Sequence, residues 1–178
     1  EISDHDAAKQ MTLKLIQLGH TSIGFVTGRK GTATTRRRLD GFLSAMKDAN
    51  LTVPDNFILE GNYEYRSGLD AGELLLQEAQ RPTAIFASND EMAAGVIAAA
   101  HKSGISVPEE LSIAGFDDSV IATVVWPQLT TVRQPIQEMA AAAVNMVTKQ
   151  CRGQTEENSI ARKLPVKLII RESTALKL

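Results

Sequence analysis

At 178 residues, the chain can hold one domain, or one domain with part of another. Its composition, 43% hydrophobic and 22% charged, is ordinary for a globular protein. The net charge of −2 provides no basic surface for nucleic acid and no acidic excess typical of disorder. A single cysteine, Cys151, excludes an internal disulfide. No stretch approaches the roughly 20 apolar residues of a membrane span.

Helical and strand-like segments alternate along the chain. Asp4 or Asp6 can cap a first helix that ends near Gly19. Leu39, Phe42 and Met46 mark one face of a second helix, and Pro135 suits the first position of a last helix. Further helices are predicted at about 67–80 and 89–102, and short apolar runs predict strands at 23–28, 57–60, 83–87, 111–116 and 165–170.

This alternation predicts an α/β fold: a three-layer sandwich with a mostly parallel sheet covered by helices on both faces. Ligands of such sheets bind beyond the carboxyl ends of the strands. The rule selects the loops 28–38, 61–66, 88–91 and 117–134. The sequence therefore predicts a binding cleft, but the topology does not name its ligand.

The basic run Arg36, Arg37, Arg38 is predicted to open a helix. It can be a solvated face, yet helical spacing separates the three side chains by roughly 100° each, so they point in different directions. Arg38 lies nearest the apolar face. There its guanidinium can donate paired hydrogen bonds to vicinal hydroxyls or to a carboxylate.

Other polar residues follow the predicted strands. Asp117 can accept hydrogen bonds from sugar hydroxyls, or it can cap a loop as Asp118 can. Asn89 caps a helix, and its amide can also face the cleft. Tyr63 can stack on the apolar face of a pyranose ring or pack within its loop.

The helix around 91–100 is apolar nearly all round, so one buried face does not account for it. It is either an alanine-rich surface helix or a helix buried against a second surface, for which a partner subunit is the economical candidate. We predict a homodimer interface that includes Ala93, Ala94, Val96, Ile97, Val125 and Trp126.

Enzymatic chemistry has no visible candidate. The sequence contains no nucleophile elbow, no Walker A loop and no dinucleotide-binding glycine motif. His5, His20 and His101 lie far apart in the sequence and are interpreted as solvated or helix-end residues. No metal site and no cofactor are predicted.

Seven phrases, in order, resemble the effector-binding core of the LacI/GalR family of transcription repressors. They are 18–24 (LGHTSIG), 38–42 (RLDGF), 81–86 (RPTAIF), 89–95 (NDEMAAG), 111–118 (LSIAGFDD), 127–135 (PQLTTVRQP) and 170–174 (IREST). The resemblance implies a periplasmic-binding-protein-like fold of two subdomains with a sugar or purine effector between them, and dimers formed through these cores. It implies effector contacts for Arg38, Asp117 and Asn89, an aromatic at Tyr63, a loop position facing the ligand for Thr34, and a crossover position near the cleft for Gln134.

The resemblance also implies missing parts. The family's N-terminal helix-turn-helix and hinge helix have no counterpart here, nor does most of the first subdomain. Residues 3–133 and 164–178 would form the second subdomain, and 135–160 a remnant of the first. We expect the helix from Pro135, deprived of its partner sheet, to dock elsewhere, to pair with another chain or to be poorly ordered.

The sequence thus predicts a cytoplasmic sensor of a small molecule, with operator DNA bound only through the missing segment. The alternative is a periplasmic sugar-binding protein of a transport system, which shares the fold.

Overall fold

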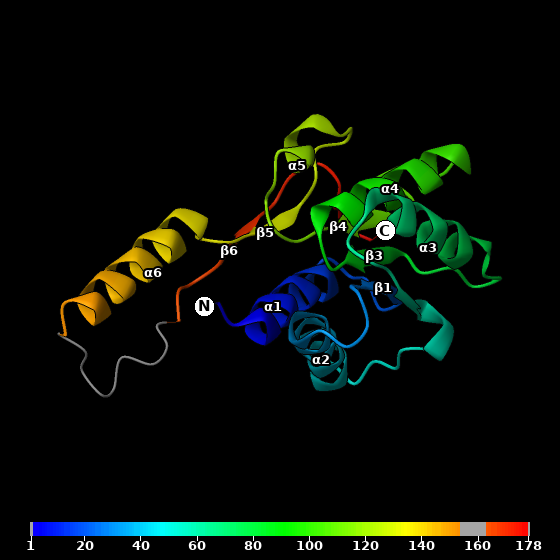
Figure 1. Ribbon diagram of the computed structural model, residues 1–178. Helices are drawn as coiled ribbons and strands as arrows, with labels where there is room; N and C mark the ends of the chain where they lie inside the picture. Colours follow the sequence, from blue (N-terminus) through cyan, green and yellow to red (C-terminus); the bar gives the residue numbers. More distant parts are fainter. Residues whose placement is uncertain (1, 154–162, 178) are drawn as a thin grey trace.

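A parallel sheet of four short strands lies at the centre of the computed structural model, which describes residues 2–153 and 163–177 (Figure 1). The strand order is β2-β1-β3-β4. The strands are β1 (Ile23–Thr27), β2 (Ile58–Glu60), β3 (Ala84–Ala87) and β4 (Ser112–Ala114). Phe25 of β1 is in register with Ile58 and with Phe86, and Ala84 with Ser112. The predicted α/β fold with a mostly parallel sheet is confirmed.

Helices cover both faces of this sheet (Figure 1). They are α1 (Asp4–Gln17) and α2 (Ala33–Asp48) on one face, and α3 (Tyr65–Gln77) and α4 (Asp90–Lys102) on the other. Strand side chains alternate between the two layers, as the pleat requires: Phe25 packs with α1 and α2, and Val26 with α3 and α4. The Phe25 ring stacks on Phe42 of α2 at a centroid distance of 4.8 Å. Two apolar cores, one on each face, therefore fix the helices on the sheet.

Side-chain caps place the starts of α1 and α2. Ser3, and not Asp4 or Asp6, caps α1 by accepting a hydrogen bond from the backbone N–H of Asp6. Thr32 caps α2 in the same way, through the N–H of Thr35 at 3.2 Å. Helix α2 therefore begins at Ala33, before the arginine run 36–38, and not at the run itself. Thr34, expected in a loop, lies in the first helical turn.

Helix α4 is buried by its own chain, which corrects the expectation of a partner subunit along it. Gly68 of α3 and Gly95 of α4 let the two helices touch: a Cβ on Gly68 would lie 2.1 Å from the Met92 carbonyl oxygen, and one on Gly95 2.2 Å from that of Tyr65. The second surface is thus α3 of the same chain. Four residues predicted at a dimer interface are no more than 3% exposed: Ala93, Ala94, Val96 and Ile97.

The segment after β4 was expected to be irregular but contains regular elements. A short helix, α5 (Ile121–Val124), is followed by β5 (Thr131–Arg133), which pairs antiparallel with β6 (Lys167–Ile169). A 3-10 turn, Asp55–Phe57, also precedes β2. Isolated β-bridges pair Ala114 with Thr130 and Asp117 with Arg133. The segment that contains β5 therefore lies alongside β4.

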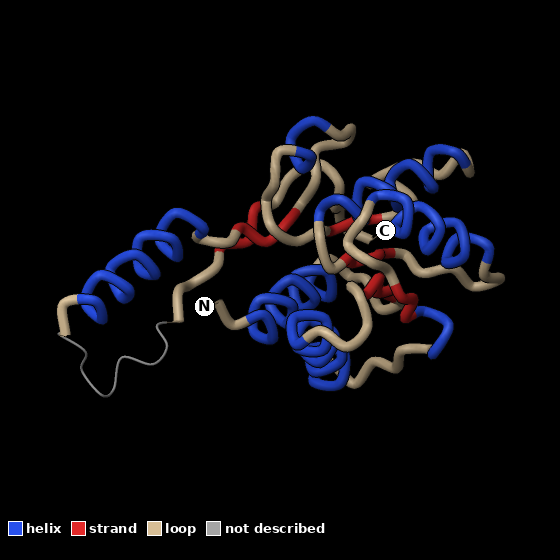
Figure 2. Tube along the Cα trace, in the orientation of Figure 1, coloured by secondary structure: helices blue, strands red, loops and turns tan. Residues whose placement is uncertain are grey.

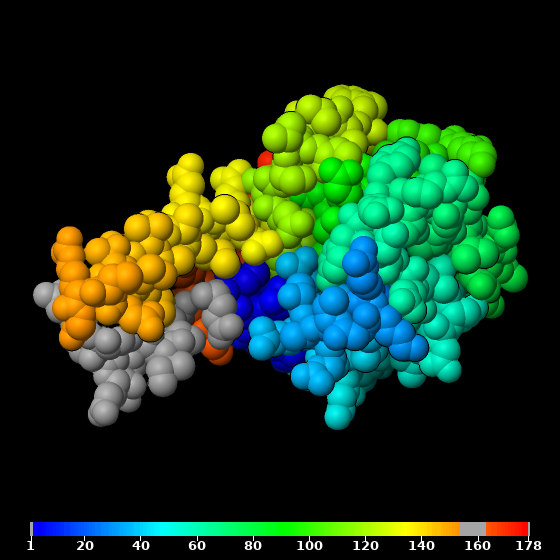
Figure 3. All heavy atoms as spheres, in the orientation of Figure 1, coloured from blue at the N-terminus to red at the C-terminus, as the bar shows by residue number. Residues whose placement is uncertain are grey.

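Helix α6 (Ile136–Cys151) extends away from the sheet beyond β5 and β6 (Figures 2 and 3). None of its residues is buried, and Ile136, Val144 and Val147 are 57%, 65% and 59% exposed. The assignment of this helix to a remnant of the first subdomain stays a prediction. Residues 154–160 of the predicted first-subdomain remnant lie outside the described residues.

His20 follows the end of α1, as the helix-end alternative predicted, but it is buried and not solvated. Its exposure is 3%, and its ring nitrogens lie 3.0 Å from Thr83 Oγ1, 2.9 Å from Ser112 Oγ and 3.2 Å from the Ala175 carbonyl oxygen. The C-terminal segment returns across the start of the sheet and covers the ring. This contact joins residues 155 positions apart, which local sequence patterns do not reveal.

Candidate functional site

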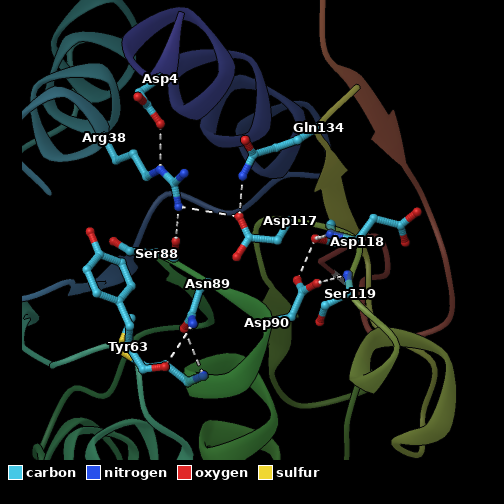
Figure 4. A network of polar contacts seen from close by, with 12 residues as sticks. Asp4, Arg38, Tyr63, Ser88, Asn89, Asp90, Asp117, Asp118, Ser119 and Gln134 are labelled. Carbon is cyan, nitrogen blue, oxygen red and sulfur yellow. Dashed lines mark hydrogen bonds and ion pairs between the residues drawn. The ribbon is translucent and has the colours of Figure 1, made fainter. Parts of the chain in front are cut away.

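The carboxyl ends of the strands bring the predicted polar residues together at one edge of the sheet (Figure 4). Arg38 reaches this edge from α2, Tyr63 follows β2, Asn89 follows β3 and Asp117 follows β4. Gln134 comes from the strand connection to α6. The edge of the sheet therefore collects these side chains from five separate segments.

Arg38 is held rigidly on three sides. Its Nε donates to Asp4 Oδ1 at 2.8 Å, one Nη donates to the Ser88 carbonyl oxygen, and the guanidinium carbon lies 3.6 Å from the centroid of the Phe116 ring. The side chains of Arg38 and Asp4 are only 6% and 10% exposed. The cation is thus compensated within the protein.

Asp117 faces Arg38 across the site. Its Oδ1 is 3.7 Å from Arg38 Nη1 and accepts a hydrogen bond from Gln134 Nε2 at 2.6 Å. Burial raises the pKa of Asp117, while the guanidinium of Arg38 and the Gln134 amide oppose this increase. With 36% of the side chain exposed, Asp117 offers acceptor capacity to solvent or to a ligand.

Asn89 both caps α4 and fixes the loop that carries Tyr63. Its Oδ1 accepts from the N–H of Met92 at 3.0 Å, and its Nδ2 donates to the Tyr63 carbonyl oxygen at 2.9 Å. The predicted cap is present, and the amide nitrogen, for which a place facing the cleft was the further alternative, donates to the backbone of the Tyr63 loop.

The Tyr63 ring covers the backbone of Gly28 at the end of β1. A Cβ on Gly28 would lie 1.9 Å from Tyr63 Cζ, so any other residue here would require the ring to move. The phenol oxygen is 2.8 Å from Thr35 Oγ1, and the Tyr63 backbone has φ +74°. Tyr63 is therefore tied to the first turn of α2, in which Thr34 also lies, one turn before Arg38.

A hollow of about 420 Å³ opens beside Asp117, between the edge of the sheet and the first turn of α6. Polar and apolar surface both line it, from Asp117, Asp118, Arg133, Gln134, Pro135, Ile136, Gln137 and Glu138. The described residues contain no group of three or more His, Cys, Asp or Glu that could hold a metal ion. No helix among them is long and apolar enough to cross a membrane.

Two acidic residues beside the site have distant partners that the sequence does not predict, and for Asp118 only a loop cap was expected. Asp118 forms ion pairs with Arg133 and, at 2.6 Å, with Arg171 of the C-terminal segment. Asp90 is 1% exposed and hydrogen-bonded to residues 29 and 41 positions away. No spacing in the sequence signals either network.

Comparison with known proteins gives a consistent result. The sequence model of one protein family, described as a periplasmic binding protein-like domain, matches residues 12–174 of this chain. Catabolite control protein A of Priestia megaterium is 40% identical over 174 residues, which cover 97% of this chain and 52% of that protein. HTH-type transcriptional repressor PurR of Klebsiella pneumoniae is 38% identical over 161 residues, 90% of this chain and 47% of the relative. The chain thus spans about half the length of these curated relatives.

A solved structure agrees with these relatives. A sugar-binding transcriptional regulator of the LacI family from Escherichia coli, crystallised with phosphate, superposes with a TM-score of 0.91 at 31% identity. The match covers 99% of this chain and 63% of that one.

Proposed function

Because the chain belongs to the periplasmic binding protein-like domains of LacI-family regulators, we propose that its site binds a neutral, polyhydroxylated effector, a sugar above all. The effector contacts would come from Arg38, Asp117, Asn89, Tyr63, Thr34 and Gln134. One observation carries the proposal: Arg38 Nη1 and Asp117 Oδ1 lie 3.7 Å apart at the edge of the sheet.

The charge balance favours a neutral ligand over an anionic one. Asp4 already compensates Arg38, and Asp117 adds a second carboxylate to the same edge. An approaching phosphate or carboxylate would meet this negative charge, whereas hydroxyl groups can donate to Asp117. The similar LacI-family regulator from Escherichia coli is a sugar-binding protein whose structure contains phosphate, so the choice of a neutral ligand rests on the charges at Arg38 and Asp117.

In a protein of the relatives' full length, the part outside this chain would supply the other half of the cleft. Effector binding between two subdomains would favour one of their relative orientations through differential affinity. That orientation would control operator DNA binding by an N-terminal helix-turn-helix, in the cytoplasm. The exposed apolar face of α6, with Val144 and Val147, would then pack on the first subdomain.

A homodimer would use a surface near α5. Val120, Val124 and Trp126 are 80%, 70% and 73% exposed and lie within seven residues of one another, whereas Val125 is partly buried against the core. An apolar cluster of this kind is typical of a subunit contact. Trp126 therefore stays in the proposed dimer interface. The α4 residues no longer belong to it, and the α5 segment takes their place.

Isothermal titration calorimetry against neutral pentoses, hexoses and disaccharides, with sugar phosphates and purines alongside, tests the effector proposal. Asp117→Asn should weaken binding of a neutral sugar by about 10- to 100-fold, the effect of one hydrogen bond to a charged group. Arg37→Ala is the matched control for Arg38→Ala, because Arg37 is exposed in the same run. Unchanged affinity in Asp117→Asn and Arg38→Ala would reject the site, and binding restricted to anionic compounds would reject the ligand class.

A further inference from the structure

A buried carboxylate lies behind the site without facing it. Asp90, the first residue of α4, is 1% exposed, and both of its oxygens are engaged (Figure 4). Oδ1 accepts from Thr131 Oγ1 at 2.5 Å, and Oδ2 accepts from the backbone N–H of Ser119 at 2.7 Å. The Thr131 hydroxyl in turn accepts from the N–H of Asp118 at 3.3 Å. Asp90 thus connects α4, β5 and the turn at 117–119.

The turn that Asp90 contacts has an unfavourable backbone. Asp117 has φ +118° and Asp118 φ +56°, in the left-handed region that favours glycine. Such residues cost about 1–3 kcal/mol each and persist only when their surroundings hold them. Directly after Asp117, the N–H of Asp118 donates to the Thr131 hydroxyl and the N–H of Ser119 donates to Asp90. These hydrogen bonds therefore act where the backbone is least favourable.

The chain also makes room for this carboxylate. A Cβ on Gly115 would lie 2.4 Å from Asp90 Oδ1, so glycine at the end of β4 is what admits the Asp90 side chain. Burial raises the pKa of Asp90 to about 6, which means that a charge is kept here at neutral pH against its desolvation cost. A buried polar side chain retained despite its desolvation cost, next to a strained turn, is typical of a functional constraint.

We propose that Asp90 is a positioning residue: with Thr131 it holds the 117–119 turn in its left-handed conformation and so aims the Asp117 carboxylate at Arg38 and Gln134. The importance of that carboxylate for ligand binding rests on the proposed function. Asp90 itself does not face the ligand. Its role requires two hydrogen-bonding atoms in the right places and not the charge.

An asparagine side chain can fill both places. In Asp90→Asn, the amide oxygen can accept from the N–H of Ser119, while the amide nitrogen donates to Thr131 Oγ1, whose second lone pair still serves Asp118. Asp90→Asn is therefore the conservative variant, and Asp90→Ala removes both contacts. At the other end of the contact, Thr131→Ser keeps the hydroxyl, and Thr131→Val removes it at nearly constant shape.

The test uses the ligand-free protein and two NMR readouts: amide hydrogen exchange at Asp118 and Ser119, and the pKa of Asp117 from its carboxyl carbon. In Asp90→Ala and Thr131→Val, exchange at these amides should accelerate by about 10-fold or more, the loss of one hydrogen bond with its partner left unsatisfied. The raised pKa of Asp117 should fall toward its ordinary value as the side chain reaches solvent. Asp90→Asn and Thr131→Ser should resemble the unchanged protein, as should Glu91→Ala, an exposed acid on the same turn.

Unchanged exchange and an unchanged Asp117 pKa in the two disruptive variants would overturn the proposal. Faster exchange spread equally over β1 and β3 would overturn it as well, because Asp90 would then support the whole fold and not the turn. If Asp90→Ala does not fold, Thr131→Val carries the test alone. Since no ligand is needed, a failure to find any bound sugar would reject the effector proposal and leave this one standing.

Discussion

Arg38 Nε donates to Asp4 Oδ1 over 2.8 Å, which joins the first turn of α1 to α2 beneath the carboxyl edge of the sheet. Both side chains are almost fully buried. Arg38 therefore arrives at the site as half of an ion pair, with donors left over but its charge compensated. The group that gives the site its net charge is Asp117. This is why hydroxyl donors suit the site better than anions do.

Removing one member of this pair should destabilise the fold. Asp4→Ala removes the nearer counter-charge of the buried Arg38 guanidinium and leaves only Asp117, 3.7 Å away, and the loss of one partner of a buried pair costs up to about 3–5 kcal/mol. Urea unfolding of the variant measures the loss. Asp48→Ala is the control, because Asp48 pairs with Lys9 at the surface, where the cost should be at most about 1 kcal/mol. Equal losses in the two variants would contradict the role assigned to the buried pair.

The close approach of α3 and α4 makes Gly95 sensitive to substitution. Gly95→Ala places a methyl group 2.2 Å from the Tyr65 carbonyl oxygen, so the helices must separate, at about 1–3 kcal/mol. Thermal unfolding should show a lower midpoint. Gly24→Ala is a milder comparison, because its methyl group would meet only side-chain ends of Leu75 and Pro82, at 3.2 Å and 3.3 Å. A Gly95→Ala midpoint at or above that of Gly24→Ala would show that the helices are not in backbone contact.

His20 should make stability depend on pH. Burial lowers its pKa below the ordinary value of 6.5, so the unfolded chain binds the proton more readily than the fold does. The contribution of His20 is then complete above pH 6.5 and is lost as the pH falls from there toward the lowered pKa. Asp90, whose pKa is raised to about 6, acts in the opposite direction: its contribution is lost as the pH rises through 6.

Comparing variants separates the two effects. The loss of unfolding free energy between pH 7.5 and 5.5 should be smaller in His20→Gln than in the unchanged protein, while the Asp90 contribution is common to both. His101→Gln, at an exposed position, should leave the profile as it is. Identical profiles for all three proteins would mean that His20 is not held neutral by burial.

The order of the elements and the location of the site could be predicted because both depend on local patterns. Apolar runs such as 84–87 and the periodicity around Phe42 specify strand and helix within a few residues. Parallel strand order then places Arg38, Asn89 and Asp117 at one edge without further information.

What the sequence did not reveal depends on contacts between distant segments. The burial of His20 needs Ala175, and the engagement of Asp90 needs Thr131. The apolar helix α4 was given a partner subunit because nothing local says that Gly68 lets α3 cover it. In each case the contact that decides burial comes from a segment far away in the sequence, which a local pattern does not reveal.

Trp126 provides a test of self-association near α5. It is the chain's single tryptophan and is 73% exposed, so its fluorescence should shift to shorter wavelength as a dimer forms with rising protein concentration. Trp126→Ala should weaken the dimer by about 2 kcal/mol or more, as truncation of a buried interface aromatic does, and sedimentation velocity measures the change. Leu74→Ala on α3, 56% exposed, should have no effect. Val144→Ser on α6 distinguishes the two exposed apolar surfaces. If Val144→Ser dissociates the dimer and Trp126→Ala does not, the dimer contact is made by α6. In a protein of full length, the first subdomain would cover that surface of α6.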